Sequence, residues 1–487
     1  MAKNIMIQGT MSGAGKSLIA AGLCRLFKQE GYRVAPFKSQ NMALNSFITA
    51  SGAEMGRAQV VQAEAAGIDP DVRMNPILLK PTTDVGSQVI VNGVVQGNMR
   101  AMEYYRRKRE FIPTVLEAYR SLDAEFDIIV IEGAGSPAEI NLKNEDIVNM
   151  GLARLVDAPV LLVGDIDRGG VFAQLFGTIA LLEPEEKQRI KGTIVNKFRG
   201  DRAILQPGID ILERICGVPV AGVVPYAHLD IDDEDSLSPR LHSSNVRKAV
   251  DIAVIQLPRI SNFTDVTPLG RYEHVSLRYI QRPDQLGEPD MIVLPGTKST
   301  ISDLLWLRQT GLEGAILKQA ARGCVIFGIC GGFQMLGSAI SDPQQVETAG
   351  LTRVNGMKLL DMDTVFEEEK VQRQVSGIFP LIDGVFQRLS GKSYHGYEIH
   401  MGRSGQGSRP LLCRGNVYGS YVHGIFDGDG IADAIVNALA ERKGVRLDCL
   451  AGFNPEAYKQ RQYDLLADAL RSGLDMNFVH RVLNREV

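Results

Sequence analysis

The stretch GTMSGAGKS, residues 9–17, decides the fold of the first half of this chain. It follows the short apolar run NIMIQ and precedes residues 17–30, where apolar side chains recur with the period of one helix face. A glycine-rich turn between a strand and a helix directs backbone N–H groups toward a bound phosphate. The spacing departs from the standard motif, because five residues rather than four separate Gly9 from Gly15. We predict a nucleotide-phosphate loop here; a glycine-rich turn without a ligand is the alternative.

This loop and two later strand ends supply the candidate ATP and Mg²⁺ contacts. Lys16 would neutralise charge on the outer phosphates, and Ser17 would bind Mg²⁺. Glu132 ends the run DIIVIE, where ligands bind in open parallel sheets, and is the second Mg²⁺ candidate. Asn196 follows another strand and would read the edge of a base, although a turn explains it equally well. The predicted ATP-binding residues are Gly9, Thr10, Gly13, Gly15, Lys16, Ser17 and Asn196.

A polar segment, KSQNMALNS, lies between the apolar run YRVAPF and the next predicted helix. It offers one cation and three amides, a combination that suits a carboxylate-bearing substrate better than an apolar one. The candidate substrate-binding residues are Lys38, Gln40, Asn41 and Asn45.

A second reactive signature, FGICGGFQ, occupies residues 327–334. Cys330 lies between a predicted strand and a predicted helix, with glycines two positions away on each side, as in the strained elbow that exposes a nucleophile. A free thiol is only about a few per cent thiolate at neutral pH, so it needs a cation, a helix N-terminus or a base. His423, after the apolar run in SYVHGIF, is the best candidate base. A buried structural cysteine is the alternative for Cys330.

The turn LPGTKST, residues 294–300, follows a further apolar run. Backbone N–H groups at such a turn can stabilise an oxyanion, and so can the N–H that follows a nucleophile in an elbow. Gly296 and Gly331 are therefore the predicted oxyanion-binding positions.

The composition indicates an α/β protein that is long enough to form more than one hydrophobic core. The chain has 487 residues, is 45% hydrophobic, contains 50 glycines and carries a formal net charge of -4. Neither nucleic acid nor an anionic membrane is favoured as a partner by that charge. With no signal-like opening and no long apolar run, we expect a cytoplasmic protein. The six cysteines are scattered, so neither a disulfide framework nor a zinc site is indicated.

Two sets of apolar runs alternate with helical stretches, which predicts two α/β domains, each a mainly parallel sheet flanked by helices. The stretch LDIDDEDSLSPRLHSSN between them is acidic and serine-rich, and so resembles a linker. The expected parts are a nucleotide-binding domain at 1–235, a linker at 236–250, a cysteine-bearing domain at 251–445 and a helical tail at 446–487 that could pack on either domain.

These motifs carry a family resemblance over essentially the whole chain. The PGT turn, GICGGFQ and YVHGIF resemble a class I glutamine amidotransferase domain, and the first half resembles the P-loop fold of dethiobiotin synthetase. In this order, together with KSQNMALNS, VIEGAGSPAEINL, DIDRGGVFA, NKFRGD and YEIHMG, they resemble the cobyric acid synthases.

The resemblance implies ATP- and glutamine-dependent amidation of the b, d, e and g carboxylates of adenosylcobyrinic acid a,c-diamide, a corrinoid polycarboxylate. By motif match, Cys330 attacks glutamine, His423 transfers its proton, and Gln334 joins Gly296 and Gly331 in binding glutamine. Many class I glutaminases carry an acid two residues after the histidine, but Ile425 stands there in this chain. What orients His423 is left open, with Glu398 as one candidate.

Three other functions are weighed against this one. A cobyrinic acid a,c-diamide synthase would use the same chemistry on the a and c carboxylates. A non-catalytic protein switched by a nucleotide would use the cysteine domain for docking, which the coincidence of Lys16, Cys330 and His423 disfavours. A lone ATP-dependent carboxylase would leave the second domain unexplained.

Overall fold

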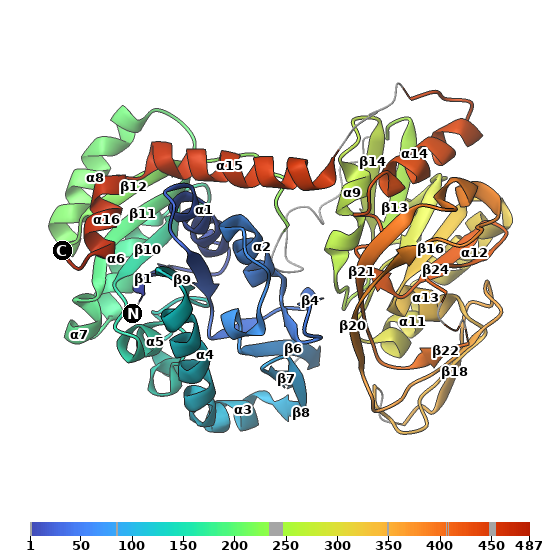
Figure 1. The fold of residues 1–487 in the computed structure, drawn as a ribbon, viewed down its shortest axis with the longest axis horizontal. Coiled ribbons are helices and arrows are strands. Elements are labelled where there is room, and N and C mark those ends of the chain that lie inside the picture. The colour runs from blue at the N-terminus through green and yellow to red at the C-terminus, as the bar shows by residue number, and fades with distance from the viewer. Residues whose placement is uncertain are drawn as a thin grey trace. The chain divides into compact units, whose positions relative to one another are not determined.

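The computed structural model describes residues 2–83, 86–232, 247–347, 350–405, 407, 409–447 and 454–487 (Figure 1). Two compact units divide the chain. The first unit comprises Met1–Met42, Met55–Asp232 and Glu456–Val487, and the second comprises Ala43–Glu54 and Asp233–Pro455. Most of the predicted linker falls outside the described residues.

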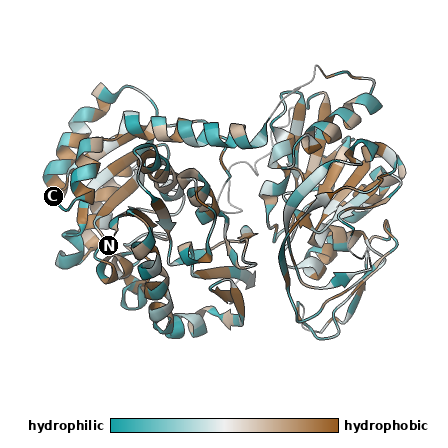
Figure 2. Ribbon diagram, viewed as in Figure 1, coloured by the Kyte–Doolittle hydropathy of each residue, from teal (hydrophilic) through white to brown (hydrophobic). Residues whose placement is uncertain are grey.

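The first unit is built on a six-stranded sheet with the order β12-β11-β10-β1-β9-β2, and all its neighbouring strands are parallel. Helices cover both faces of this sheet, so its strands are buried and consist mainly of apolar residues. These strands are largely brown, the colour of hydrophobic residues, in Figure 2. The strands are β1 (Lys3–Gly9), β2 (Val34–Phe37), β9 (Ile128–Glu132), β10 (Val160–Asp165), β11 (Ile190–Phe198) and β12 (Val220–Pro225).

Helices and a smaller sheet complete the first unit. The helices are α1 (Lys16–Gln29), α2 (Arg57–Ala66), α3 (Ala101–Arg107), α4 (Ile112–Glu125), α5 (Met150–Leu155), α6 (Val171–Leu181), α7 (Pro184–Lys187), α8 (Arg202–Cys216), α15 (Pro455–Gly473) and α16 (Met476–Leu483). The smaller sheet has the order β3-β6-β7-β8, with β3 (Gln40–Met42), β6 (Ile77–Thr83), β7 (Gly86–Val91) and β8 (Val94–Arg100).

The C-terminal tail packs on the first unit. In Figure 1 the red helix α15 lies next to α1, and Leu470 shares the core of that unit with Leu23. Gly22 permits the close approach, because a Cβ there would lie 2.3 Å from a methyl of Leu470. Arg25 of α1 also forms a 2.7 Å ion pair with Asp464 of α15.

The second unit is also built on a six-stranded sheet, of order β14-β13-β15-β16-β24-β23. The strands are β13 (Val250–Ile255), β14 (Val275–Ile280), β15 (Met291–Leu294), β16 (Val325–Ile329), β24 (Val417–Ser420) and β23 (Leu412–Arg414). The pair β23–β24 is antiparallel, and the other neighbouring pairs of this sheet are parallel. Two α/β units with mainly parallel sheets confirm the predicted fold class.

Short helices and small sheets surround this second sheet. The helices are α9 (Thr267–Gly270), α10 (Pro283–Leu286), α11 (Thr300–Gln309), α12 (Leu312–Ala321), α13 (Gly331–Leu336) and α14 (Ile431–Arg442). One small sheet contains β20 (Val371–Ile378), β21 (Ser393–His400) and β25 (Val422–His423). Another contains β17 (Ala339–Ser341), β18 (Arg353–Asn355), β19 (Asp363–Val365) and β22 (Arg403–Ser404). The segment Ala43–Glu54 contributes β4 (Ser46–Ile48), and β5 (Glu54–Gly56) returns the chain to the first unit.

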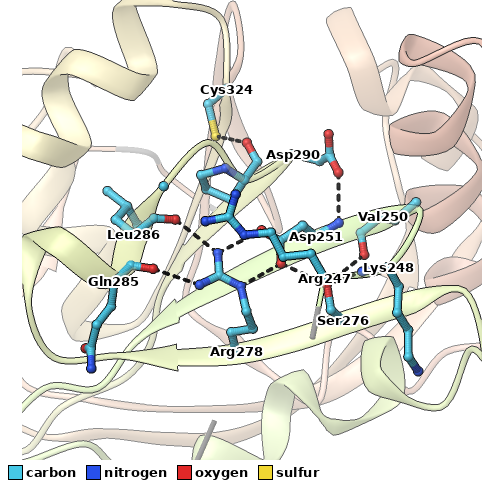
Figure 3. A network of polar contacts seen from close by, with 12 residues as sticks. Arg247, Lys248, Val250, Asp251, Ser276, Arg278, Gln285, Leu286, Asp290 and Cys324 are labelled. Atoms are coloured by element: carbon cyan, nitrogen blue, oxygen red, sulfur yellow. Dashed lines mark hydrogen bonds and ion pairs between the residues drawn. The ribbon is translucent and has the colours of Figure 1, made fainter. Parts of the chain in front are cut away.

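A buried ion pair lies near the amino end of β13 (Figure 3). Arg278 donates to both carboxylate oxygens of Asp251 at 2.7 Å, and its remaining donors reach the carbonyls of Gln285 and Leu286. Ser276 also donates to Asp251, at 2.8 Å. Because these buried charges are paired and hydrogen-bonded within the scaffold, we assign them a structural role.

Within the described part of the chain, no helix combines the length and apolarity needed to cross a bilayer.

Candidate active sites

The nucleotide-phosphate loop connects β1 to α1 in the first unit. Gly13 and Gly15 adopt left-handed backbone conformations, with φ of 75° and 99°. At Gly15 a Cβ would lie 2.2 Å from the amide nitrogen of Asn196, so only glycine fits. The Lys16 ammonium donates to the carbonyls of Met11 and Gly135, both at 3.0 Å, and thus lies at the loop.

The Glu132 carboxylate forms the polar centre beside this loop. It is fully buried at the end of β9 and accepts hydrogen bonds from four side chains. Ser17 Oγ and Lys38 Nζ donate to Oε1, each at 2.8 Å. Gln59 and Gln62 of α2 donate to Oε2, at 3.3 and 2.5 Å. These contacts compensate for the cost of burying a charge.

Ser17 and Glu132 together fit a site for Mg²⁺. A hydroxyl oxygen lies next to a carboxylate oxygen at the phosphate loop, and Mg²⁺ prefers oxygen ligands that it shares with phosphates and water. Both residues were predicted from the sequence. Gln59 and Gln62 were not, because a polar residue on a predicted helix is usually solvated.

The four predicted substrate-binding residues have different surroundings. Lys38 pairs with Glu132, the Gln40 side chain accepts from Tyr104 at 2.7 Å, and Asn41 donates to Gln59 at 3.0 Å. Asn45 belongs to the segment that packs with the second unit.

Of the other predicted nucleotide contacts, Gly9 ends β1, and Thr10 and Asn196 lie at the edges of the loop. Asn196 donates its side-chain amide to the carbonyl of Ala14 at 2.9 Å, and Thr10 donates to Gln174 at 3.2 Å. Both side chains border the loop that is predicted to hold the phosphates.

Cys330 occupies a sharp turn between β16 and α13 in the second unit. Its backbone has φ 51° and ψ -109°, a conformation that is strained for a residue with a Cβ. At Gly332 a Cβ would lie 2.0 Å from the carbonyl oxygen of Leu294, which explains the glycine there. Cys330 is 7% exposed as a residue, and its Sγ donates to the carbonyl of Ile399 at 3.4 Å.

His423 lies beside this cysteine and contacts a carboxylate on its other side. Nδ1 is 2.7 Å from Oδ2 of Asp265, and Oδ1 of the same carboxylate accepts from the N–H of Gly424 at 3.0 Å. Burial alone would lower the pKa of His423, but Asp265 and Cys330 raise it to about 10. The imidazole is therefore oriented by Asp265 and carries its second proton at neutral pH.

Asp265 answers the question that the sequence left open. It lies in a short 3₁₀ helix, Phe263–Val266, in a stretch without a recognisable motif, 158 residues from His423. The sequence candidate, Glu398, instead forms a 2.7 Å ion pair with Arg373. Position 425, where many class I glutaminases carry an acid, is isoleucine in this chain, and the carboxylate that contacts His423 comes from Asp265 instead.

The predicted oxyanion-binding positions lie close to the cysteine and the histidine. A Cβ at Gly296 would be 3.2 Å from Cε1 of His423, and one at Gly331 would be 2.7 Å from Thr297. Gln334 is buried, and its amide donates to the carbonyl of Met401 at 2.9 Å and to the Tyr421 hydroxyl at 3.1 Å. The fold brings Gly296, Gly331, Cys330 and His423 together, while the Gln334 amide is engaged by protein groups.

A buried acid supports the turn that contains Gly296. Asp303 accepts from the Thr297 hydroxyl at 2.5 Å and from the N–H of Arg259 at 3.2 Å. Burial raises the pKa of Asp303 to about 6, against the opposing effect of these hydrogen bonds.

Comparisons with known proteins assign each unit to a described domain. Residues 5–237 match the model of the CobQ/CobB/MinD/ParA nucleotide binding domain, and residues 251–431 match that of the CobB/CobQ-like glutamine amidotransferase domain. A phosphate loop beside a buried carboxylate, followed by a cysteine elbow with its histidine, defines a glutamine-hydrolysing, ATP-using amide ligase.

Whole-chain relatives narrow this class. The chain is 57% identical to the cobyric acid synthase of Lachnoclostridium phytofermentans over 100% of both chains. It is 56% identical to that of Ruminiclostridium cellulolyticum, over 100% of this chain and 98% of the relative. It is 52% identical to that of Clostridium acetobutylicum, over 99% of each. The chain belongs to the cobyric acid synthase family.

Proposed function

We propose that this chain amidates the b, d, e and g carboxylates of adenosylcobyrinic acid a,c-diamide, with ATP as energy source and glutamine as nitrogen donor, to give adenosylcobyric acid. The observation that carries the proposal is the Cys330–His423–Asp265 arrangement in a chain that also holds a phosphate loop. Because ATP and glutamine are metabolites of the cell interior, we place the reaction in the cytoplasm.

The second unit would release ammonia from glutamine. The Cys330 thiolate, stabilised by the His423 imidazolium, attacks the side-chain amide carbon and forms a C–S bond. Backbone N–H groups near Gly296 and Gly331 stabilise the negative oxygen of the tetrahedral intermediate. His423 then gives its proton to the departing nitrogen, ammonia leaves, and a glutamyl thioester stays on Cys330. Water, deprotonated by His423, cleaves the thioester to glutamate and restores the thiolate.

The first unit would activate the carboxylate. A substrate carboxylate oxygen attacks the γ-phosphorus of ATP, ADP leaves, and an acyl phosphate forms. Lys16 and the loop N–H groups stabilise the transferring phosphoryl group. Ammonia then attacks the acyl carbon, the C–O bond breaks, phosphate leaves and the amide remains.

Mg²⁺ would be held by Ser17 and Glu132, and when bound it supplies positive charge beside the phosphates. Lys38, next to Glu132 at 2.8 Å, is the residue of the predicted substrate-binding set that we place nearest to the transferring group. Gln40, Asn41 and Asn45 stay candidates for contact with the corrinoid.

Replacement of the cysteine by serine tests the proposal. Cys330→Ser should abolish glutaminase activity and glutamine-dependent amidation, because a serine hydroxyl in that position is a poor nucleophile. Amidation with ammonium chloride at alkaline pH should persist. Loss of both nitrogen sources in a folded variant would contradict a division of the chemistry between the two units.

A further inference from the structure

Residues 43–54 belong to the first half of the sequence but pack with the second unit. Both ends of this segment are hydrogen-bonded. At one end the Ser46 N–H donates to the Asn262 side-chain oxygen at 3.1 Å. At the other end Glu54, which is fully buried, forms a 2.5 Å ion pair with Lys370. A segment held in this way is an integral part of the unit that contains Cys330.

The segment contacts the ring that stacks on His423. The Tyr397 hydroxyl donates to the carbonyl of Ser46 at 2.8 Å and accepts from the Asn262 amide at 2.9 Å. The Tyr397 ring stacks on the His423 imidazole, with ring centroids 5.3 Å apart and an angle of 21° between the planes. The rings of Phe47 and Tyr397 form a T-shaped contact, with centroids 5.0 Å apart. The segment therefore helps to fix the surface on which the imidazole rests.

The same segment also contacts residues that neighbour Cys330 and Asp265. Ile48 packs in one small apolar cluster with Tyr397 and Ile399, and the carbonyl of Ile399 accepts from Cys330 Sγ at 3.4 Å. Asn262, whose side chain binds Ser46, starts the turn that contains Asp265, because its carbonyl accepts the Asp265 N–H at 3.0 Å.

We propose that residues 43–54 are a positioning element of the glutaminase centre, acting on His423 through Tyr397 and Asn262. The inference rests on the proposed function. Tyr397 is a positioning residue, since its hydroxyl meets Ser46 and Asn262 while its ring meets the imidazole.

The variant Tyr397→Phe tests the proposal, because it keeps the ring and removes the hydroxyl. We expect kcat/KM for glutamine to fall about tenfold, since the buried Ser46 carbonyl loses its donor. The pH profile of glutaminase should shift, because the imidazole is held differently. Ammonium-dependent amidation should be unchanged.

Tyr394→Phe is the matched control. Tyr394 lies on the same strand, β21, and its ring packs against Phe379 at 4.9 Å. This variant should match the unaltered chain in all three measurements.

Asn262→Gly provides a second, independent variant. Asn262 has φ 50°, which glycine adopts without strain, so the backbone is kept and only the amide is lost. It should reproduce the Tyr397→Phe result. Unchanged kcat/KM for glutamine and unchanged pH profiles in both variants would overturn the inference. Absence of glutaminase in the unaltered chain would instead contradict the proposed function.

Discussion

Each unit places a buried carboxylate beside a side chain with a proposed catalytic role, but the two carboxylates are used differently. Asp265 in the second unit contacts His423 and the adjacent N–H of Gly424. Glu132 in the first unit accepts from Ser17, Lys38 and two glutamines. In the glutaminase centre, Asp265 already holds His423 in the position needed for reaction. At Glu132, by contrast, a bound metal ion would have to displace protein hydrogen-bond donors from the carboxylate. We expect one centre to be preorganised and the other to form with its ligands.

The largest effect is expected at Glu132. Glu132→Gln should lower amidation about a thousandfold with either nitrogen source, because the site loses the negative charge that would help bind Mg²⁺ at the phosphates. Glutaminase without ATP should be retained. Steady-state rates with glutamine and with ammonium chloride measure both expectations, and loss of glutaminase alone would reverse the assignment of the two centres.

A large effect limited to the other centre is expected at Asp265. Asp265→Asn should lower the glutaminase kcat by about a hundredfold to ten-thousandfold, since the histidine loses its orienting charge. Ammonium-dependent amidation should be unaffected. A variant that hydrolyses glutamine at the normal rate would show that the 2.7 Å contact has no part in the reaction.

The same variant changes the pH dependence. In the folded chain the pKa of His423 is raised from 6.5 to about 10, so its protonation contributes stability fully below pH 6.5 and loses it as the pH rises through 10. Without the Asp265 charge the pKa falls, and the alkaline limb of the glutaminase profile should move to lower pH. A limb that stays in place would exclude His423 as the titrating group.

Lys38→Met sharpens the comparison at the first centre. Removal of one partner of a buried pair leaves an uncompensated carboxylate, which should lower the free energy of unfolding by about 3 kcal/mol. Mg²⁺ should recover part of that loss by taking the position of the ammonium, so MgCl₂ should raise the melting temperature more than in the unaltered chain.

Arg278→Met is the matched control for that experiment. It breaks the buried Asp251 pair of Figure 3, which lies in the scaffold of the second unit. A similar loss of stability is expected, with no recovery by MgCl₂. Equal recovery in both variants would mean that Mg²⁺ acts nonspecifically.

The smallest effect is expected at Asp303. Its pKa is raised from 3.8 to about 6, so this acid favours folding fully below pH 3.8, and that contribution is lost as the pH rises through 6. Asp303→Asn keeps the acceptor for Thr297 and cannot ionise, so it should raise the free energy of unfolding at pH 8 by about 1–3 kcal/mol. Urea unfolding at pH 5 and pH 8 measures this, and an equal change at both pH values would contradict it.

The sequence predicted the parts of each centre that local chemistry determines. Glycine spacing and residue type led to Lys16, Ser17 and Cys330, and the structure places all three at strand-to-helix turns. The fold class followed from alternating apolar runs for the same reason.

Residues brought in by tertiary packing could not be predicted. Asp265 is 158 residues from His423, in a stretch without a motif, and Gln62 lies on an ordinary polar helix position. The segment 43–54 gives no local sign that it packs with the second unit, because its partners Asn262 and Lys370 lie more than 200 residues away in the sequence. The sequence did not indicate which domain the C-terminal tail packs on. In the structure it packs on α1, where Leu470 lies against Gly22.

The transfer of nitrogen between the two centres is tested most directly by isotope labelling. The chain is supplied with ATP, adenosylcobyrinic acid a,c-diamide and glutamine labelled with ¹⁵N at the side-chain amide, with unlabelled ammonium present at low concentration. Mass spectrometry of the corrinoid product should find ¹⁵N in each new amide for the unaltered chain, and only unlabelled amides for Cys330→Ser. Unlabelled amides from the unaltered chain, or labelled amides from Cys330→Ser, would contradict the account.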